Sequence, residues 1–141
     1  MSVWNLLAAC AAALATAAAA AQAAPIPPAG AAEIRRGGAA AYECYLRFSG
    51  LRQAADFAGC VQATHAGDQR AAGEGDAAFD AGLYFRAAQF IRIKVEVLQG
   101  DPPSDAPDLT PVLRALAAQS DQAQRKLHLT DSQMLELLAG Q

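Results

Sequence analysis

His65 is the residue in this sequence best suited to acid–base chemistry, because an imidazole titrates near neutral pH. Three carboxylates follow it closely, those of Asp68, Glu74 and Asp76. A histidine within reach of a carboxylate is a common general base, so one alternative is a small hydrolase-type enzyme that uses His65. The residue also lies where a helix is expected to end, beside a glycine-containing segment. A histidine there is more simply explained as a polar residue that interacts with the helix dipole.

Asp76 and Asp80 are four residues apart, which places them on one face of a helix. Two such carboxylates could share a metal ion or a proton, but acidic residues in a first helical turn are explained more simply by the helix dipole. The sequence contains none of the common nucleophile-elbow, phosphate-loop or zinc-protease motifs. We therefore expect no catalytic residues, no cofactor and no metal site, and a protein that is not an enzyme.

The cysteines are Cys10, Cys44 and Cys60. If the N-terminal segment is removed, an even number remains, which in an exported chain indicates a disulfide. No Cys-x-x-Cys redox pair exists, and two thiols cannot complete a tetrahedral zinc site. The sequence therefore predicts a disulfide between Cys44 and Cys60.

The first 23 residues have the features of a signal peptide. Residues 6–21 are apolar apart from Thr16, about the length of a signal-peptide core and shorter than a spanning helix. Small residues before Ala24 predict cleavage after Ala23, giving a periplasmic or secreted protein. The segment before the core carries no lysine or arginine, so two alternatives stay open: an uncleaved membrane anchor, and lipidation at Cys10, which ends a sequence matching the lipobox of bacterial lipoproteins. The chain would contact a membrane only in these two cases.

The rest of the chain is expected to form a single domain. Residues 24–38, rich in proline, glycine and alanine, predict a flexible lead-in, and residues 39–141 predict the helical domain. The formal net charge of −3 argues against a nucleic-acid partner, which would require a basic surface.

Hydrophobic periodicity predicts an all-α fold, a small bundle of four to five helices. The expected helices cover residues 39–48, 51–64, 76–98 and 110–127, followed by a short helix after a capping box at Thr130. The first two would form an antiparallel hairpin linked by the disulfide. A tight turn at 49–50 would place Cys44 opposite residue 55 or 56, so the bond to Cys60 requires a second helix that starts near Gln53, or a stagger.

Residues 91–97 carry a competing signal, because apolar β-branched residues alternate with charged ones, as in a strand. No second run of this kind exists to pair with it, so the helix over 90–98 is preferred. A strand could pair only with another copy of the chain, and the sequence leaves a homo-oligomer open.

The helix over 76–98 is apolar over more than one face, so its neighbours are expected to leave part of it uncovered. We expect the partner or ligand surface to include Phe79, Leu83, Phe90 and Ile91. The leading hypothesis is an exported, non-enzymatic helical protein that binds a macromolecular partner, an unidentified protein of the cell envelope. The second is a carrier of a small apolar ligand or lipid, with its cavity among the same four residues.

Overall fold

The computed structural model describes residues 26–72 and 76–139. Its helices are α1 (Pro28–Arg47), α2 (Ala54–Ala72), α3 (Ala77–Gly100), α4 (Thr110–Leu127) and α5 (Asp131–Leu138), with a 3-10 turn at Leu51–Gln53 before α2. The described residues contain no strand, so the prediction of a small all-α bundle is confirmed. The predicted signal peptide and Cys10 lie outside the described residues.

The predicted flexible lead-in is wrong for residues 28–38, which form the first half of α1. Pro28 suits a first helical turn, where its missing N–H is not needed. The side chain of Ile34 is fully buried in the core, so tertiary packing stabilises a segment that is weakly helical by composition. The loop expected after His65 is likewise wrong as far as Ala72, because α2 continues to that residue.

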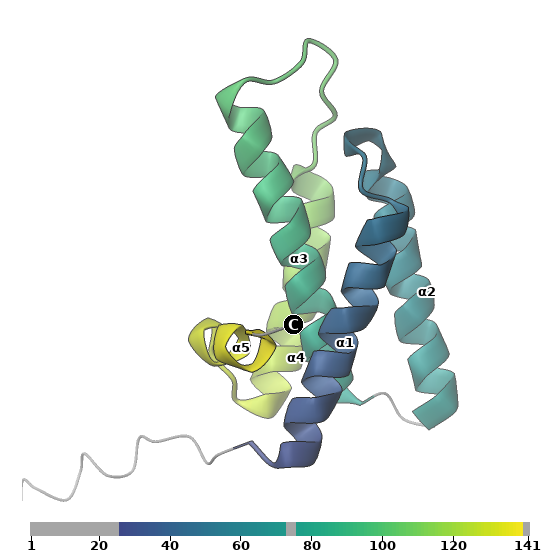
Figure 1. Cartoon of the computed structure of the whole chain (residues 1–141), viewed down its shortest axis with the longest axis vertical. Helices are drawn as coiled ribbons and strands as arrows, with labels where there is room; N and C mark the ends of the chain where they lie inside the picture. The colour runs from purple at the N-terminus through teal and green to yellow at the C-terminus, as the bar shows by residue number, and fades with distance from the viewer. Residues whose placement is uncertain (1–25, 73–75, 140–141) are drawn as a thin grey trace, which may run out of the picture.

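Helices α1 and α2 form the predicted antiparallel hairpin (Figure 1). The disulfide between Cys44 and Cys60 joins them, with a Cα–Cα distance of 5.7 Å. Because of the 3-10 turn, α2 starts at Ala54. The sequence analysis required a start near Gln53 for Cys60 to lie opposite Cys44, and this requirement is met. The disulfide prediction is therefore confirmed.

Helices α1 and α3 run parallel and touch through two glycines (Figure 1). A Cβ on Gly82 would lie 1.8 Å from the carbonyl oxygen of Ile34, and a Cβ on Gly37 would lie 2.0 Å from that of Phe79. Further along both helices, the rings of Tyr45 and Phe90 stack with their centroids 4.4 Å apart. The absence of side chains at the two glycines lets the backbones approach this closely.

The connection 101–109 returns the chain so that α4 packs antiparallel to α3, and α5 lies across the lower half of the bundle (Figure 1). The core has two parts. The larger lies among α1, α2, α3 and the start of α4 and includes Phe57, Leu83, Tyr84, Ile91 and Leu116. The smaller joins α5 to α1 and α3 through Ile34, Phe85, Met134 and Leu138.

Residues 91–97 are helical, so the preferred interpretation of this segment is confirmed. On a helix, the alternating apolar residues of this segment do not share one face. Ile91 and Lys94 are buried, whereas Ile93 and Val97, which a strand would place on the same face as Ile91, point to solvent.

Candidate functional site

Three of the four residues expected to form the partner or ligand surface lie in the core. Phe79, Leu83 and Ile91 are at most 2% exposed, and only Phe90 is partly exposed. The expectation was wrong for these three because α1 is longer than predicted and its glycine contact brings it directly onto α3. Of the four residues among which the sequence placed a cavity for an apolar ligand, Phe90 lines the cavity described below.

In the described part of the chain, four of the five large apolar residues that reach solvent lie on α1 and α3, and the fifth, Leu135, lies on α5. Tyr42 and Leu46 are four residues apart on α1, and Ile93 and Val97 are four apart on α3. Their exposed fractions are 49%, 56%, 57% and 67%. Phe90 precedes Ile93 by three residues and Val97 by seven, so it shares their face of α3, and its ring centroid lies 6.2 Å from that of Tyr42. We call these five residues the upper groove.

A cavity of about 430 Å³ opens at the lower end of the upper groove. It is lined by Gly38, Ala39, Tyr42, Arg86 and Phe90. The small residues on α1 leave this space, while Phe90 forms its floor by stacking on Tyr45, which lies beneath it. The cavity is mostly apolar, with one guanidinium at its edge.

Helix α5 occupies the next part of the same α1–α3 boundary. Met134 and Leu138 of α5 are buried against α1 and α3. Arg35 Nε of α1 donates a 3.0 Å hydrogen bond to the carbonyl of Leu137, and Arg86 Nη2 of α3 donates one of 3.0 Å to the carbonyl of Leu138. The two arginines thus satisfy carbonyls at the C-terminal end of α5, which an α-helix leaves without partners.

A second cavity, of about 240 Å³, lies among α2, α3 and α4, and we call it the polar cavity. Its lining residues are His65, Gln69, Ala77, Asp80, Tyr84, Gln119, Gln122, Ala123 and Lys126. The only two of these that are not polar are alanines, whose methyl side chains are too small to fill the space.

His65 contacts a carboxylate other than the ones predicted. Its Nδ1 lies 2.7 Å from Oδ1 of Asp80, and the two side chains are 22% and 17% exposed. Tyr84 packs beside the imidazole with the ring centroids 5.6 Å apart and donates a hydrogen bond to Oε1 of Gln62. Burial raises the pKa of Tyr84 to about 12, and the negative charge of Asp80 adds to the rise.

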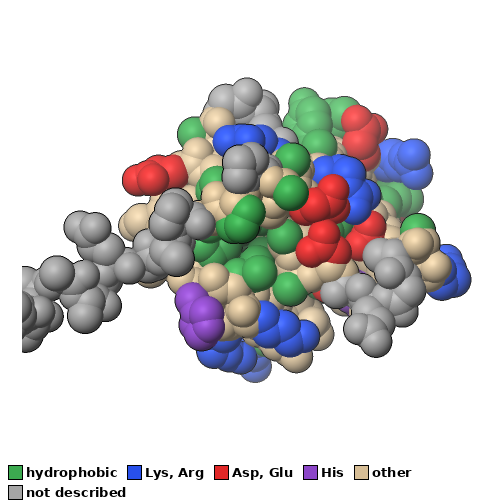
Figure 2. Space-filling view, turned by 90° about the horizontal axis from the view of Figure 1, so that it is seen from below, with side chains coloured by type: hydrophobic (Ala, Val, Ile, Leu, Met, Phe, Trp, Pro, Cys, Tyr) green, Lys and Arg blue, Asp and Glu red, His purple; other side chains and the backbone are tan. Residues whose placement is uncertain are grey.

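The carboxylates predicted to serve His65 have other partners. Asp68 Oδ1 accepts a 2.7 Å hydrogen bond from Arg36, whose guanidinium also pairs with Glu33 and lies over the ring of Phe79. Figure 2 shows acidic and basic side chains side by side on the lower end of the molecule. The hydrogen bonds from Arg36 lower the pKa of Glu33. The predicted His65 constellation is therefore not assembled through Asp68.

Asp76 caps α3, because its Oδ1 accepts the backbone N–H of Ala78 at 2.9 Å. Asp80 bonds to His65 instead, so the two aspartates do not act as a pair, and Glu74 lies outside the described residues. Across residues 26–72 and 76–139, no group of three histidine, cysteine or acidic residues could hold a metal ion.

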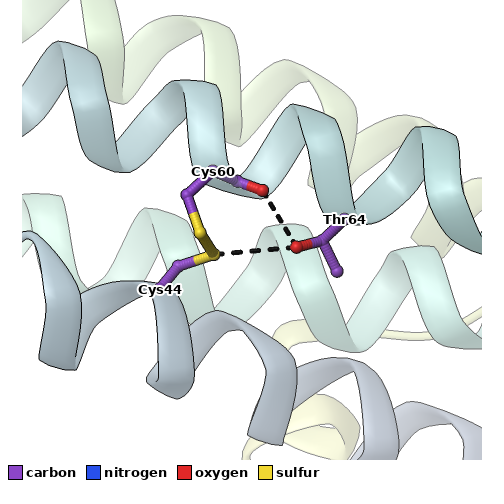
Figure 3. The surroundings of a disulfide bond; sticks show 3 residues. All are labelled: Cys44, Cys60 and Thr64. Carbon is purple, nitrogen blue, oxygen red and sulfur yellow. Dashed lines mark hydrogen bonds between the residues drawn. A yellow bond between two sulfur atoms is a disulfide. The ribbon is translucent and has the colours of Figure 1, made fainter.

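The disulfide lies beside the hydroxyl of Thr64 (Figure 3). Thr64 Oγ1 donates a 2.9 Å hydrogen bond to the carbonyl of Cys60 and lies 3.7 Å from Sγ of Cys44. Cys44 itself is 2% exposed. Such a bond is typical of an oxidising compartment. No helix in the described part of the chain is long and apolar enough to span a bilayer.

Sequence reasoning missed Tyr42, Leu46, Ile93 and Val97 as exposed residues, and Lys126 and the glutamines as cavity residues. For the four apolar residues, the sequence did contain a signal, because the two residues of each pair are four apart and so lie on one face of a helix. The sequence did not show that the two pairs lie on adjacent helices. No family model, no curated protein and no solved structure matches this chain.

Proposed function

We propose that this chain is an exported protein that binds another protein of the cell envelope through the upper groove. The observation that carries the proposal is the set of four large apolar side chains that remain about half exposed or more on adjoining faces of α1 and α3. A stable small domain usually buries such residues, and a contiguous group of them on one surface is typical of a binding site.

The structure supports an amphipathic helix as the element that the groove receives. Helix α5 already packs into the lower part of this boundary through Met134 and Leu138, which are four residues apart. The upper groove continues the same boundary past Arg86, which contacts both α5 and the cavity. A partner helix with apolar residues at steps of three and four would repeat the packing of α5.

An open surface suits a helix better than it suits a lipid. A carrier encloses most of the surface of its ligand. Here Leu46, Ile93 and Val97 are more than half exposed and do not line the cavity at the lower end of the groove. An acyl chain in the groove would keep much of its length in water.

Export is supported by two independent features. Residues 1–23 have the composition and the small-residue cleavage signal of a signal peptide. The Cys44–Cys60 disulfide is typical of proteins in an oxidising environment such as the periplasm or the cell exterior. Intact mass of the protein recovered from the cell exterior or the periplasm checks this part, with residue 24 expected as the new N-terminus.

Site-specific photo-crosslinking tests the binding surface. We would place a photoreactive amino acid at Tyr42 or at Ile93 in cells, with Ala118, an exposed position on α4, as the control. Both groove positions should yield an adduct with one and the same partner protein, and position 118 should not. The substitution Leu46→Lys should abolish the adduct, whereas Ala118→Lys, which adds the same charge to another exposed helix face, should leave it unchanged.

Two results contradict the proposal. An adduct between two copies of this chain would assign the groove to self-association. The absence of any adduct at 42 and 93 in folded, exported protein would show that the surface is not a binding site.

A further inference from the structure

We infer that a thiol reductant opens the Cys44–Cys60 disulfide in the folded protein by attacking Cys60 and releasing Cys44. The bond joins α1 to α2 (Figure 3). The upper groove takes no part in this reaction, so the inference does not depend on the proposed function.

Solvent reaches the two cysteines to different extents. Cys44 is 2% exposed and belongs to the larger core, whereas Cys60 is partly exposed and lines an open depression where the end of α1 meets α2. Arg47 and Asp56, which have opposite charges, also line the depression, so it carries no net charge that would repel a thiolate. A thiolate must reach the sulfur that it attacks, and the difference in exposure therefore favours attack at Cys60.

The small residues beside Cys60 keep this approach open. Ala55, Gly59 and Ala63 follow each other at steps of four on α2, all three are exposed, and all three line the depression. A Cβ added at Gly59 would have no atom within 4 Å. Because these positions carry at most a methyl group, a molecule that approaches from solvent meets no large side chain along this row.

Thr64 supports the release of Cys44. Its Oγ1 donates a hydrogen bond to the carbonyl of Cys60 and lies 3.7 Å from Sγ of Cys44 (Figure 3). Negative charge develops on that sulfur as the disulfide breaks, and the hydroxyl proton can turn from the carbonyl toward it. A hydrogen bond of this kind stabilises a thiolate, and a more stable thiolate leaves faster.

The reaction is a two-step thiol–disulfide exchange. The thiolate of the reductant forms a bond to Sγ of Cys60 while the Cys44–Cys60 bond breaks, and Cys44 departs with the electron pair as a thiolate. A second thiolate of the reductant then attacks the reductant's sulfur in the mixed disulfide and displaces Cys60. The reductant ends as a disulfide, two electrons have passed to the protein, and both cysteine sulfurs take up protons from water.

Mapping of the mixed disulfide tests which sulfur is attacked. We would incubate the disulfide-bonded protein with reduced glutathione, quench with acid at early times, block free thiols with N-ethylmaleimide and digest with trypsin. Cys10, Cys44 and Cys60 fall on different tryptic peptides, 1–35, 37–47 and 53–70. We expect glutathione on 53–70 and maleimide on 37–47. Glutathione on 37–47, or an equal division between these two peptides, would overturn the inference.

Low concentrations of urea show whether the folded protein is the species that reacts. Attack on the folded protein should proceed at a rate that urea leaves unchanged below the unfolding transition. A reaction that requires unfolding would accelerate steeply, because the free energy of unfolding falls linearly with urea. Such an acceleration would also overturn the inference.

Two substitutions at Thr64 test its part in the release of Cys44. Thr64→Val keeps the shape of the side chain without the hydroxyl and should slow the exchange about 3-fold, because the leaving thiolate loses a hydrogen bond. Thr64→Ser keeps the hydroxyl and should retain the wild-type rate. Equal slowing in both variants, or none in Thr64→Val, would contradict this role of Thr64.

A bulky residue in the depression tests the route of approach. Ala63→Phe should slow the exchange about 10-fold, because its ring obstructs access to Cys60. Ala118→Phe, which adds the same ring at an exposed position of α4, should leave the rate unchanged. An unchanged rate in Ala63→Phe would show that the reductant does not enter through the depression, and would overturn attack at Cys60 from this side. If Ala63→Phe does not fold, the mapping of the wild type still decides the question.

Discussion

Lys94 illustrates how a single charged side chain can belong to the core. Its exposed fraction is 8%, and Nζ donates hydrogen bonds to the carbonyls of Ser49 and Gly50 in the turn that follows α1. The ammonium group also lies 5.3 Å from the ring centroid of Tyr45. Burial lowers the pKa of Lys94. The sequence did not indicate that Lys94 is buried, because the turn supplies acceptors that no sequence pattern displays.

Tyr84 provides a pH-dependent prediction at the residue scale. Its pKa is about 12 in the folded protein, against the ordinary value of 10.0 for a tyrosine, so the folded state retains the phenol proton where the unfolded state has lost it. The resulting stability is fully present below pH 10 and is lost as the pH rises toward 12. The free energy of unfolding of the wild type should therefore fall by about 1 kcal/mol between pH 9 and pH 11 relative to Tyr84→Phe.

Urea unfolding of both proteins at each pH measures this difference. Because other groups, including Lys94, titrate equally in the two proteins, their contributions cancel in the comparison. Parallel pH profiles for the wild type and Tyr84→Phe would contradict the assignment.

At the scale of elements, the sequence predicted helix starts reliably where a contact between neighbouring residues determines them. The capping box at Thr130 starts α5 as the sequence indicated, and Asp76, where the sequence placed the start of a helix, caps α3. Both caps are contacts between residues two or three apart, so they depend on the local sequence alone. The first half of α1 could not be predicted in this way, since its stability comes from Ile34 and Gly37 packing on a helix distant in sequence.

The candidate sites were less predictable than the helices for a related reason. In the polar second half of α4, Ser120 and Gln124 are buried, and Gln124 Nε2 donates a 2.8 Å hydrogen bond to Asp131. The upper groove and the polar cavity each depend on which faces of two or three helices meet. Periodicity gives the face of one helix but not the neighbour it meets.

The glycine contact between α1 and α3 yields a prediction for three positions. Gly82→Ala should lower the free energy of unfolding by about 2–3 kcal/mol, because its Cβ would overlap the carbonyl of Ile34 and force the helices apart. Gly37→Ala should act similarly, against the carbonyl of Phe79. Gly59→Ala is the matched control on α2. No atom lies within 4 Å of its added Cβ, so it should raise stability by about 0.5–1 kcal/mol.

Denaturant unfolding of the three variants measures these effects. A neutral outcome for Gly82→Ala would contradict the close approach of the two backbones.

For the molecule as a whole, the disulfide is the main covalent restraint. Cys44 and Cys60 are 16 residues apart, and closing a loop of about that length stabilises the folded state by about 3 kcal/mol in the chain-entropy model. Reduction should therefore lower the thermal midpoint by about 10 °C. The double variant Cys44→Ala/Cys60→Ala should melt near the reduced wild type and should not respond to reductant.

Differential scanning calorimetry with and without reductant checks this prediction. An unchanged midpoint on reduction, with free thiols verified by mass after alkylation, would show that the bond contributes nothing to stability.

The parallel pairing of α1 and α3 also has a kinetic consequence. Two helices that run in the same direction cannot be joined by a short loop. In this chain α2 and its connections separate α1 from α3 in the sequence, although the two helices pack together through their glycines. Contacts between α1 and α3 therefore join residues that are far apart in the sequence, and folding slows as the mean sequence separation of contacting residues rises. The Cys44–Cys60 bond links α1 to α2, so it shortens the flexible chain between α1 and α3. It thereby lowers the loop-closure entropy lost when α1 and α3 come together.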